Sequence, residues 1–526
     1  MKKSSVATLA LALTAGPGWL IGPSGGDGTD EPASDPRDDV DDVDDVDEAA
    51  EPRDDGDDAG LITIPVSLVP QGDAGGTERV NFGVPLPRNQ LDDPGRLRIA
   101  DEGSELPAYV RPIAWYDDGS LRSVQVQVEV DVSTTDELEI SLGAAASGGA
   151  LEPVPVEDTL VTADGTEGPR VFALLPPRWL VRSGLVGPVP SAPPEQGASP
   201  GAWAGVCDYE DYDSSRFASE RGSRGSWLYD RPTALYRLHA ITGDLSPLRS
   251  AYQEAHQYRT GIVGSEESTR IGVPTAENDL KYHYTQGMAV TYLLSGDERL
   301  RERVEDVAVR ASSLWNPVYT PGGSFWTERH AAFALLAYVW AARISVDRRD
   351  EFLVLADEAV DAYRDTQAAY PAEYTRDDAR CLSHGASDAG ETYGYEGCSP
   401  WLSAILADGL AEYAAERGGE RASRAREAIV KLGRFFAEFG ADPDGKPYYW
   451  LSGDGTRGER DPFHEHWGEM PYIIAMAWHY DGRRDDWMRE VAEAFVDGLA
   501  LHGEASQIRS FNWQCRSAPL TPFYLE

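Results

Sequence analysis

The segment that decides the fold is Ala331-Ala-Phe-Ala-Leu-Leu-Ala-Tyr-Val-Trp-Ala-Ala342, together with the charged stretch that follows it, residues 351–367. The first part contains no charged residue, which predicts a helix that is buried on most sides. The second part carries charges at helical spacing, which predicts a helix with one face in water. Asp347-Arg-Arg349 lies between them as a short turn. The segment therefore predicts a helical hairpin.

The same hairpin pattern occurs five times between residues 226 and 502. The paired helices are predicted at 227–239 with 247–259, 281–294 with 299–315, 326–344 with 351–367, 400–417 with 421–439, and 467–478 with 486–501. Gly243 and Gly296 stand in the turns, where a left-handed residue ends a helix. One hairpin cannot bury its apolar face alone, so neighbouring hairpins must stack. We expect an α/α toroid, incomplete and built of five or six hairpins, with the apolar helices inside and the charged helices outside.

Residues 61–165 have a different period. Leu61-Ile-Thr-Ile-Pro-Val-Ser-Leu68 and Val124-Gln-Val-Gln-Val-Glu-Val130 alternate apolar and polar residues, which indicates half-buried strands. Gly75-Gly76, Pro94-Gly95, Asp118-Gly119 and Gly148-Gly149 mark turns. This region predicts an all-β barrel or sandwich, so the fold class is a multidomain β + α protein. Residues 166–225 are a predicted connector, and residues 226–526 form the predicted toroid domain.

The first 60 residues predict export. Lys2 and Lys3 precede an apolar run, which is typical of a secretory signal and predicts a signal peptide over residues 1–23. Residues 27–60 hold 17 Asp and Glu against two Arg, so residues 24–60 predict a disordered acidic linker. No later segment is apolar for long enough to span a membrane. We expect a secreted or cell-envelope protein.

The whole chain of 526 residues has a formal net charge of −42. Such a surface repels nucleic acid and anionic membranes, which excludes those partners. It also disfavours a densely anionic polymer as a partner unless a cleft is locally basic.

The four cysteines fit an exported protein. The simplest of the three pairings joins Cys381 to Cys398 and Cys207 to Cys515, and four buried thiols are the alternative. No cysteine pair has the close spacing of a zinc site, so no metal is predicted.

Four stretches of the predicted β-domain are similar to a known family. They are Phe82-Gly-Val-Pro-Leu-Pro-Arg88, Leu97-Arg-Ile-Ala-Asp101, Leu106-Pro-Ala-Tyr-Val-Arg-Pro112 and Trp115-Tyr-Asp-Asp-Gly-Ser-Leu-Arg-Ser123. Residues 61–145 resemble the N-terminal barrel of the exo-rhamnogalacturonan lyase/YetA-like family. In that family the barrel precedes an α/α toroid, and the resemblance implies a secreted polysaccharide lyase that acts on a uronate-containing glycan. The barrel supports architecture more than chemistry.

The candidate site lies at the rim where the inner helices begin. Their first turns and the preceding loops are rich in aromatic and hydrogen-bonding side chains, which sugar rings need. Candidate acids and bases are His283, His330, Tyr393, His464 and His466. Candidate substrate-binding residues are Asp230, Arg231, Lys281, Tyr282, Gln286, Trp326, Arg329, Glu396, Glu465, Trp467 and Glu469. Tyr229, Tyr284, Glu328, His384, Asn512, Trp513 and Arg516 occupy the same rim segments.

Each of these assignments has a structural alternative. Tyr282 and Gln286 are four residues apart and would share a helix face, where Gln286 could simply bond a neighbouring helix. His283 could be a satisfied core histidine, and His330 could only support packing. His464 and His466 could be half of a metal site, but no third ligand is indicated. Residues 463–469 are the densest polar group before a buried helix, and burying them without purpose is costly.

Three functions fit these residues. In a lyase, Arg231, Lys281, Gln286 or Arg329 neutralises a uronate carboxylate while a His or Tyr removes the neighbouring proton. In a glycoside hydrolase, two carboxylates among Asp230, Glu396, Glu465 and Glu469 flank the bond. A non-catalytic glycan-binding protein keeps the aromatic residues without a convergent acid–base pair. We favour the lyase, with a polysaccharide or oligosaccharide substrate. The sequence indicates no cofactor, and it does not indicate a calcium ion. The sequence does not specify the oligomeric state.

Overall fold

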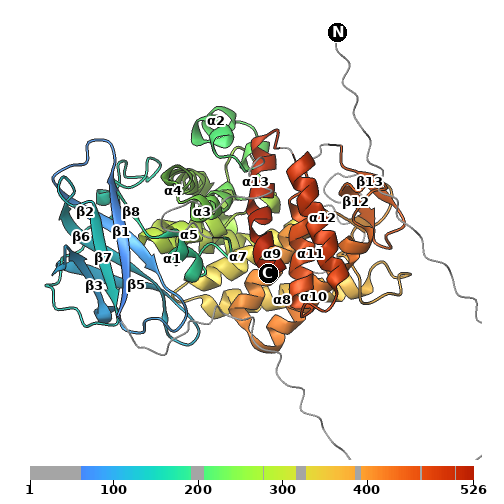
Figure 1. Ribbon diagram of the computed structural model, residues 1–526, viewed down its shortest axis with the longest axis horizontal. Helices are drawn as coiled ribbons and strands as arrows, with labels where there is room; N and C mark the ends of the chain where they lie inside the picture. Colours follow the sequence, from blue (N-terminus) through green and yellow to red (C-terminus); the bar gives the residue numbers. More distant parts are fainter. Residues whose placement is uncertain are drawn as a thin grey trace, which may run out of the picture. The chain divides into compact units, whose positions relative to one another are not determined.

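The computed structural model describes residues 61–190, 207–275, 278–315, 327–385, 393–462, 465–503 and 505–526. Within them, residues 61–174 form antiparallel sheets and residues 207–526 are mostly helical (Figure 1). The predicted β domain followed by an α/α toroid is confirmed.

The β domain is a sandwich of two antiparallel sheets. One sheet has the strand order β4-β3-β7-β1-β8 and the other β2-β6-β5. Both contribute to one apolar core, in which Val66, Val84, Val126 and Ile140 are fully buried. The strands are β1 (Ile62–Pro70), β2 (Thr77–Pro85), β3 (Leu97–Asp101), β4 (Ser104–Glu105), β5 (Ala108–Trp115), β6 (Leu121–Asp131), β7 (Glu137–Leu142) and β8 (Val171–Leu174). β8 lies beyond residue 165 and pairs with β1, so the sheet continues into the segment predicted as a connector.

Six inner helices form the ring. They are α3 (Arg231–Thr242), α5 (Gln286–Ser295), α7 (Glu328–Ile344), α9 (Pro400–Arg417), α11 (Glu469–Tyr480) and α13 (Ile508–Ser517). Every residue of α7 is buried, as the uncharged stretch 331–342 predicts for its central part. Consecutive inner helices contact one another, and α13 contacts α3, so the ring closes among the described residues. The sequence predicted an incomplete toroid of five or six hairpins, and α13 adds a sixth inner helix to the five predicted hairpins.

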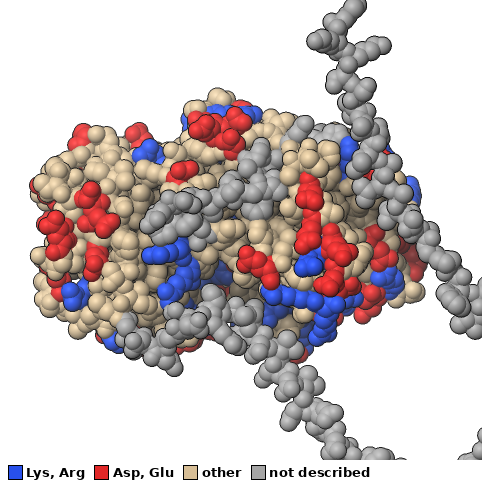
Figure 2. All heavy atoms as spheres, viewed as in Figure 1, with Lys and Arg blue, Asp and Glu red and all other residues tan. Residues whose placement is uncertain are grey.

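Five outer helices each follow an inner helix. They are α4 (Leu245–Thr260), α6 (Glu298–Leu314), α8 (Arg349–Ala369), α10 (Gly419–Phe439) and α12 (Asp486–His502). Each buries one stripe and exposes the other; α12, for example, exposes Asp486, Glu490, Glu493 and Asp497 at helical spacing. Acidic side chains gather over α12 on the face drawn in Figure 2. The outer ring therefore faces water and carries much of the negative charge.

Short elements connect these parts. They are α1 (Pro177–Arg182), α2 (Ser214–Glu220), α14 (Thr521–Leu525), β9 (Ile262–Val263), β10 (Arg270–Ile271), β11 (Gly397–Cys398), β12 (Tyr448–Ser452) and β13 (Gly458–Arg460). None of the described helices combines the length and the apolar character that crossing a membrane requires.

The sandwich is joined to the toroid by buried polar contacts. Asn81 Nδ2 donates to the Ser295 carbonyl at 2.8 Å, and Ser123 Oγ donates to the Leu293 carbonyl at 2.8 Å. Arg122 of β6 pairs with Glu416 of α9 at 2.8 Å. These contacts meet the carboxyl ends of α5 and α9, so the sandwich covers the end of the ring opposite the candidate rim.

The predicted start of the second inner helix is wrong. Residues 280–282 form a single 3-10 turn, and α5 begins only at Gln286. Tyr282 and Gln286 therefore do not share a helix face. Asp279 caps the 3-10 turn by accepting the Lys281 backbone N–H at 3.3 Å, which gives the segment an alternative to an early helix.

The axis of the ring is filled by a buried polar network. Asp408 of α9 accepts hydrogen bonds from Arg516 Nη2 at 2.7 Å and from the Tyr472 hydroxyl at 3.1 Å. Arg237 reaches the same carboxylate at 3.4 Å. Burial alone raises the pKa of Asp408, but the two arginine charges outweigh it and hold that pKa below its ordinary value. The network ties α3, α9, α11 and α13 together.

Candidate functional site

Side chains from five inner-helix segments meet near the amino-terminal rim. Tyr229 precedes α3, Arg329 and Trp401 lie in the first turns of α7 and α9, His466 precedes α11, and Trp513 lies in α13. We call these five residues the rim cluster. The sixth start contributes Tyr284, whose hydroxyl accepts the Tyr229 backbone N–H at 2.9 Å. Leading turns of the inner helices converge as the repeat pattern predicts.

Two indoles form the centre of the rim cluster. The His466 ring stacks on Trp401 with 4.7 Å between centroids and an interplanar angle of 10°, and it lies 4.7 Å from Trp513. On the other side, the Tyr229 ring stands edge-on to Trp401 at 5.8 Å and to Trp513 at 5.1 Å. The Arg329 guanidinium lies 5.7 Å from the Trp401 centroid. An imidazole and a permanent cation thus both contact the Trp401 ring.

Glu469 lies beneath His466. Its Oε1 is 3.6 Å from His466 Nδ1, and neither carboxylate oxygen has a hydrogen-bond partner among the described residues. Burial raises the pKa of Glu469, and His466 only partly opposes this. The side chain therefore favours its protonated form more than an ordinary glutamate does.

Tyr393 and Tyr449 continue the aromatic surface outward. Tyr449 lies 5.6 Å from His466 and 5.8 Å from Trp401, and the Tyr393 ring stacks on Trp450 at 5.6 Å. Both tyrosines are half-buried. The Tyr449 ring therefore lies between Tyr393 and His466.

A second polar group, the Asp279 group, gathers three predicted residues around Asp279. Asp279 binds Lys281 Nζ at 2.9 Å and His330 Nε2 at 3.4 Å, and its carbonyl lies 3.1 Å from His283 Nδ1. Burial alone raises the pKa of Asp279, but hydrogen bonds from His330 and Lys281 outweigh it and lower that pKa. His330 stacks on Trp315 of the outer ring, 6.3 Å away. His283 and His330 thus share a site with each other and not with His466.

Other predicted residues have structural partners. Arg231 pairs with Glu254 at 2.7 Å, away from the rim cluster. Gln286 accepts Arg516 Nη2 at 2.6 Å, and Asp230 Oδ2 lies 3.9 Å from Arg516 Nη1, so both belong to the axis network. Trp467 packs on Phe495 and His502 of α12.

Five predicted residues remain, and two of them lie outside the described segments. Glu465 is buried, and its carbonyl accepts Trp513 Nε1 at 3.1 Å. Tyr282 is buried, and its carbonyl accepts the Tyr258 hydroxyl. Glu396 is exposed. Trp326 and His464 lie outside the described residues.

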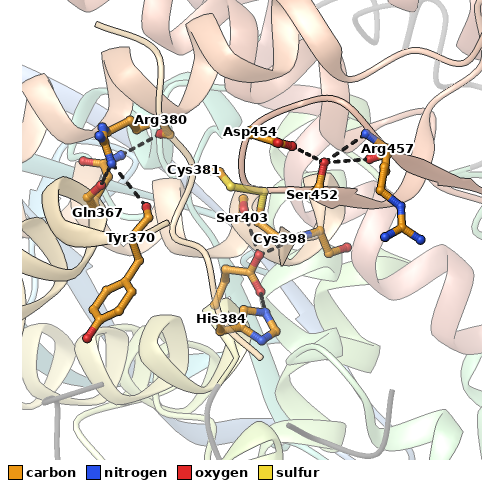
Figure 3. The surroundings of a disulfide bond; sticks show 12 residues. Gln367, Tyr370, Arg380, Cys381, His384, Cys398, Ser403, Ser452, Asp454 and Arg457 are labelled. Atoms are coloured by element: carbon orange, nitrogen blue, oxygen red, sulfur yellow. Dashed lines mark hydrogen bonds and ion pairs between the residues drawn. A yellow bond between two sulfur atoms is a disulfide. The ribbon is translucent and has the colours of Figure 1, made fainter. Parts of the chain in front are cut away.

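Both predicted disulfides are confirmed. Cys207 pairs with Cys515, and Cys381 pairs with Cys398 (Figure 3). Beside the second bond, His384 Nε2 lies 2.7 Å from a Glu328 carboxylate oxygen, and the other oxygen accepts the Ser399 N–H at 2.7 Å. Glu328 in the first turn of α7 therefore links His384 to the start of α9 beside the disulfide.

Sequence reasoning missed Trp401 and Asp279. Trp401 follows Pro400 in the first turn of an inner helix, so the rule that selected Arg329 and His330 could have found it. No described cluster of His, Cys, Asp and Glu has the geometry to hold a metal ion.

Replacing Gly287 by alanine tests the packing of the rim. A Cβ at Gly287 would lie 2.6 Å from Asp230 Oδ1 and 2.8 Å from Pro232 Cβ. Overpacking costs about 1–3 kcal/mol, which outweighs the helix-propensity gain of up to about 1 kcal/mol. We expect a lower denaturation midpoint for Gly287→Ala. Gly409→Ala in α9 is the control, because its nearest neighbour is 3.5 Å away and no loss is expected.

The buried histidines predict acid sensitivity. Burial lowers the pKa of His283 to about 4, against about 6.5 in the unfolded chain. A depressed histidine pKa adds stability above the unfolded value that is lost as the pH falls toward the folded value. Unfolding free energy should therefore fall from about pH 6.5 to about pH 4. In His283→Gln the fall should be smaller by about 3 kcal/mol; an identical pH profile would contradict the prediction.

The comparisons with known proteins give distant structural matches. The chain is similar to a glycosyl hydrolase family 88 protein from Bacteroides vulgatus, with 14% identity and a TM-score of 0.42 over 60% of this chain and 96% of that one. It is also similar to a cellobiose 2-epimerase from Bacillus thermoamylovorans, with 10% identity and a TM-score of 0.39 over 58% and 85% of the two chains.

A third match is an unsaturated glucuronyl hydrolase specific for heparin, with 14% identity and a TM-score of 0.30 over 47% and 62% of the two chains. No family model matches the sequence, and no curated protein matches it. At such identities and TM-scores, the chemistry has to be inferred from the chain's own residues.

Proposed function

We propose that this chain is an exported carbohydrate-active enzyme, a polysaccharide lyase that cleaves a uronate-containing glycan by β-elimination. The observation that carries the proposal is the position of Arg329 and His466 on the single indole of Trp401. Both side chains contact the same ring, so they would face one sugar residue bound beside the rim cluster.

The reaction needs a cation, a base and an acid. Arg329 neutralises the uronate carboxylate, which lowers the cost of removing the proton beside it. His466 takes the C5 proton, the C5–H electron pair forms the C4–C5 double bond, and the C4–O bond breaks. The departing oxygen takes a proton from a phenol, for which Tyr393 and Tyr449 are the candidates. Glu469 lies next to His466, with 3.6 Å between its Oε1 and the imidazole Nδ1.

A hydrolase is the second candidate, and Glu469 favours it. A buried carboxyl with a raised pKa is what a general acid for glycosidic cleavage requires. Glu465 is a possible second carboxylate, four positions before it.

A polysaccharide screen separates the candidates. A lyase gives a product with the ultraviolet absorbance of an unsaturated uronate, while a hydrolase gives reducing ends without that absorbance. A binding protein gives neither product but is retarded in glycan-containing gels. Arg329→Gln should lose the lyase product, while Arg303→Gln on outer helix α6 should retain it, because Arg303 pairs with Asp306 and a loop carbonyl on the outer ring. Reducing ends without absorbance would overturn the lyase proposal.

Export is supported by the two disulfides, which form and persist in oxidising compartments. The predicted signal peptide and acidic linker, residues 1–60, lie outside the described residues.

A further inference from the structure

Two consecutive residues before α3 have an unfavourable backbone conformation. Tyr229 has φ +78° and Asp230 has φ +52°, although neither is glycine. A residue with a side chain adopts such a conformation at an energetic cost, and the conformation persists only where the surroundings enforce it. Because this strained pair lies at the candidate site, we expect its backbone conformation to position a side chain there.

Neighbouring inner helices hold the pair in place. The Tyr229 N–H donates to the Tyr284 hydroxyl at 2.9 Å, and the Gly287 N–H donates to Asp230 Oδ2 at 3.0 Å. On the other side, Asn512 Nδ2 donates to the Leu228 carbonyl at 2.8 Å. Hydrogen bonds from the α5 and α13 segments therefore fix the backbone on both sides of Tyr229.

The strained backbone brings one hydroxyl group to Arg329. Arg329 Nη1 donates to the Tyr229 hydroxyl at 3.3 Å, while the Tyr229 ring is braced by Trp401 and Trp513. A phenylalanine would fill the same space between the indoles, so packing alone does not account for the hydroxyl. Tyr229 is 1% exposed and Arg329 is 8% exposed, so the arginine is the more accessible member of the pair.

We propose that Tyr229 is a positioning residue that fixes the Arg329 guanidinium over Trp401 for recognition of a uronate carboxylate. The strained Tyr229–Asp230 backbone is the device that places its hydroxyl. Substrate recognition by Arg329 rests on the function proposed above, whereas the positioning of Arg329 does not.

The test compares Tyr229→Phe, Arg329→Gln and the double variant. In a crystal structure of Tyr229→Phe, we expect the Arg329 guanidinium to leave its position over Trp401. With the best uronate glycan from the screen and its methyl ester, we expect Tyr229→Phe to lower the preference for the free acid about 10- to 100-fold, the effect of losing a hydrogen bond to a charged group. In the Arg329→Gln background, Tyr229→Phe should have no further effect on that preference.

Tyr292→Phe is the matched control. Tyr292 is also fully buried, but its hydroxyl donates to the Ile113 carbonyl at 3.0 Å, at the sandwich end of α5. It should leave the position of Arg329 and the preference unchanged. The inference is overturned if Arg329 keeps its position in Tyr229→Phe, or if the effects of the two substitutions on preference are additive. If the wild-type protein gives no lyase product, only the proposed function is refuted. The crystal structure of Tyr229→Phe still decides whether Tyr229 positions Arg329.

Discussion

Replacing His466 by glutamine is expected to lower kcat on a uronate glycan by about 10²- to 10⁴-fold, the usual contribution of a general base. Glutamine keeps a polar side chain between Trp401 and Trp513 but cannot accept the C5 proton. Initial rates of ultraviolet absorbance measure the effect, and circular dichroism checks that the variant is folded.

The matched control is His479→Gln, because His479 lies on the same helix α11 as Glu469 but near its other end, against Phe523 and Tyr524. It should keep its turnover. Full activity in the His466 variant would refute the assignment of the base, and an equal loss in both variants would indicate general damage to α11.

The second large effect concerns stability and comes from the axis of the ring. Asp408→Ala removes the carboxylate that faces Arg237 and Arg516, and both guanidiniums are about 1% exposed. Breaking a buried ion pair by removing one partner costs about 3–5 kcal/mol, because the remaining charge is left uncompensated. We expect a correspondingly lower free energy of unfolding in urea.

Glu351→Ala is the control for that measurement. Glu351 pairs with Arg348 on the outer ring, and its side chain is 52% exposed, so water already solvates both charges. The expected loss is below about 1 kcal/mol. If the two variants had similar midpoints, the Asp408 network would not hold the ring together as described.

Periodicity predicted most of the fold because the apolar and charged stretches differ over whole helices. The inner helix α7 and the outer helices α6 and α10 lie within a few residues of their predicted ranges. The prediction failed where a local hydrogen bond competes with the helix. In the segment before α5, Asp279 caps a 3-10 turn. The apolar repeat of the sequence does not reveal this local hydrogen bond.

The candidate site was only partly predictable. Position in a leading turn selected Arg329 and His466, but it could not tell which way a side chain turns from that position. His330 follows Arg329 directly and points to Trp315, whereas Arg329 points to Trp401. The left-handed backbone of Tyr229 and Asp230 depends on contacts with α5 and α13, which are distant in sequence.

The contact between the first and last inner helices has a consequence for biogenesis. Cys207 and Cys515 are separated by 308 residues, and all five hairpins lie between them. The ring of inner helices can therefore close only after every hairpin has been synthesised. Incomplete chains expose the unpaired face of their last hairpin, which chaperones must shield. Once oxidised, the bond removes chain entropy from the unfolded state that a simple polymer model puts at about 6 kcal/mol. Before the disulfide forms, the chain should mature slowly and be sensitive to proteases. After the disulfide forms, the folded chain should resist proteases.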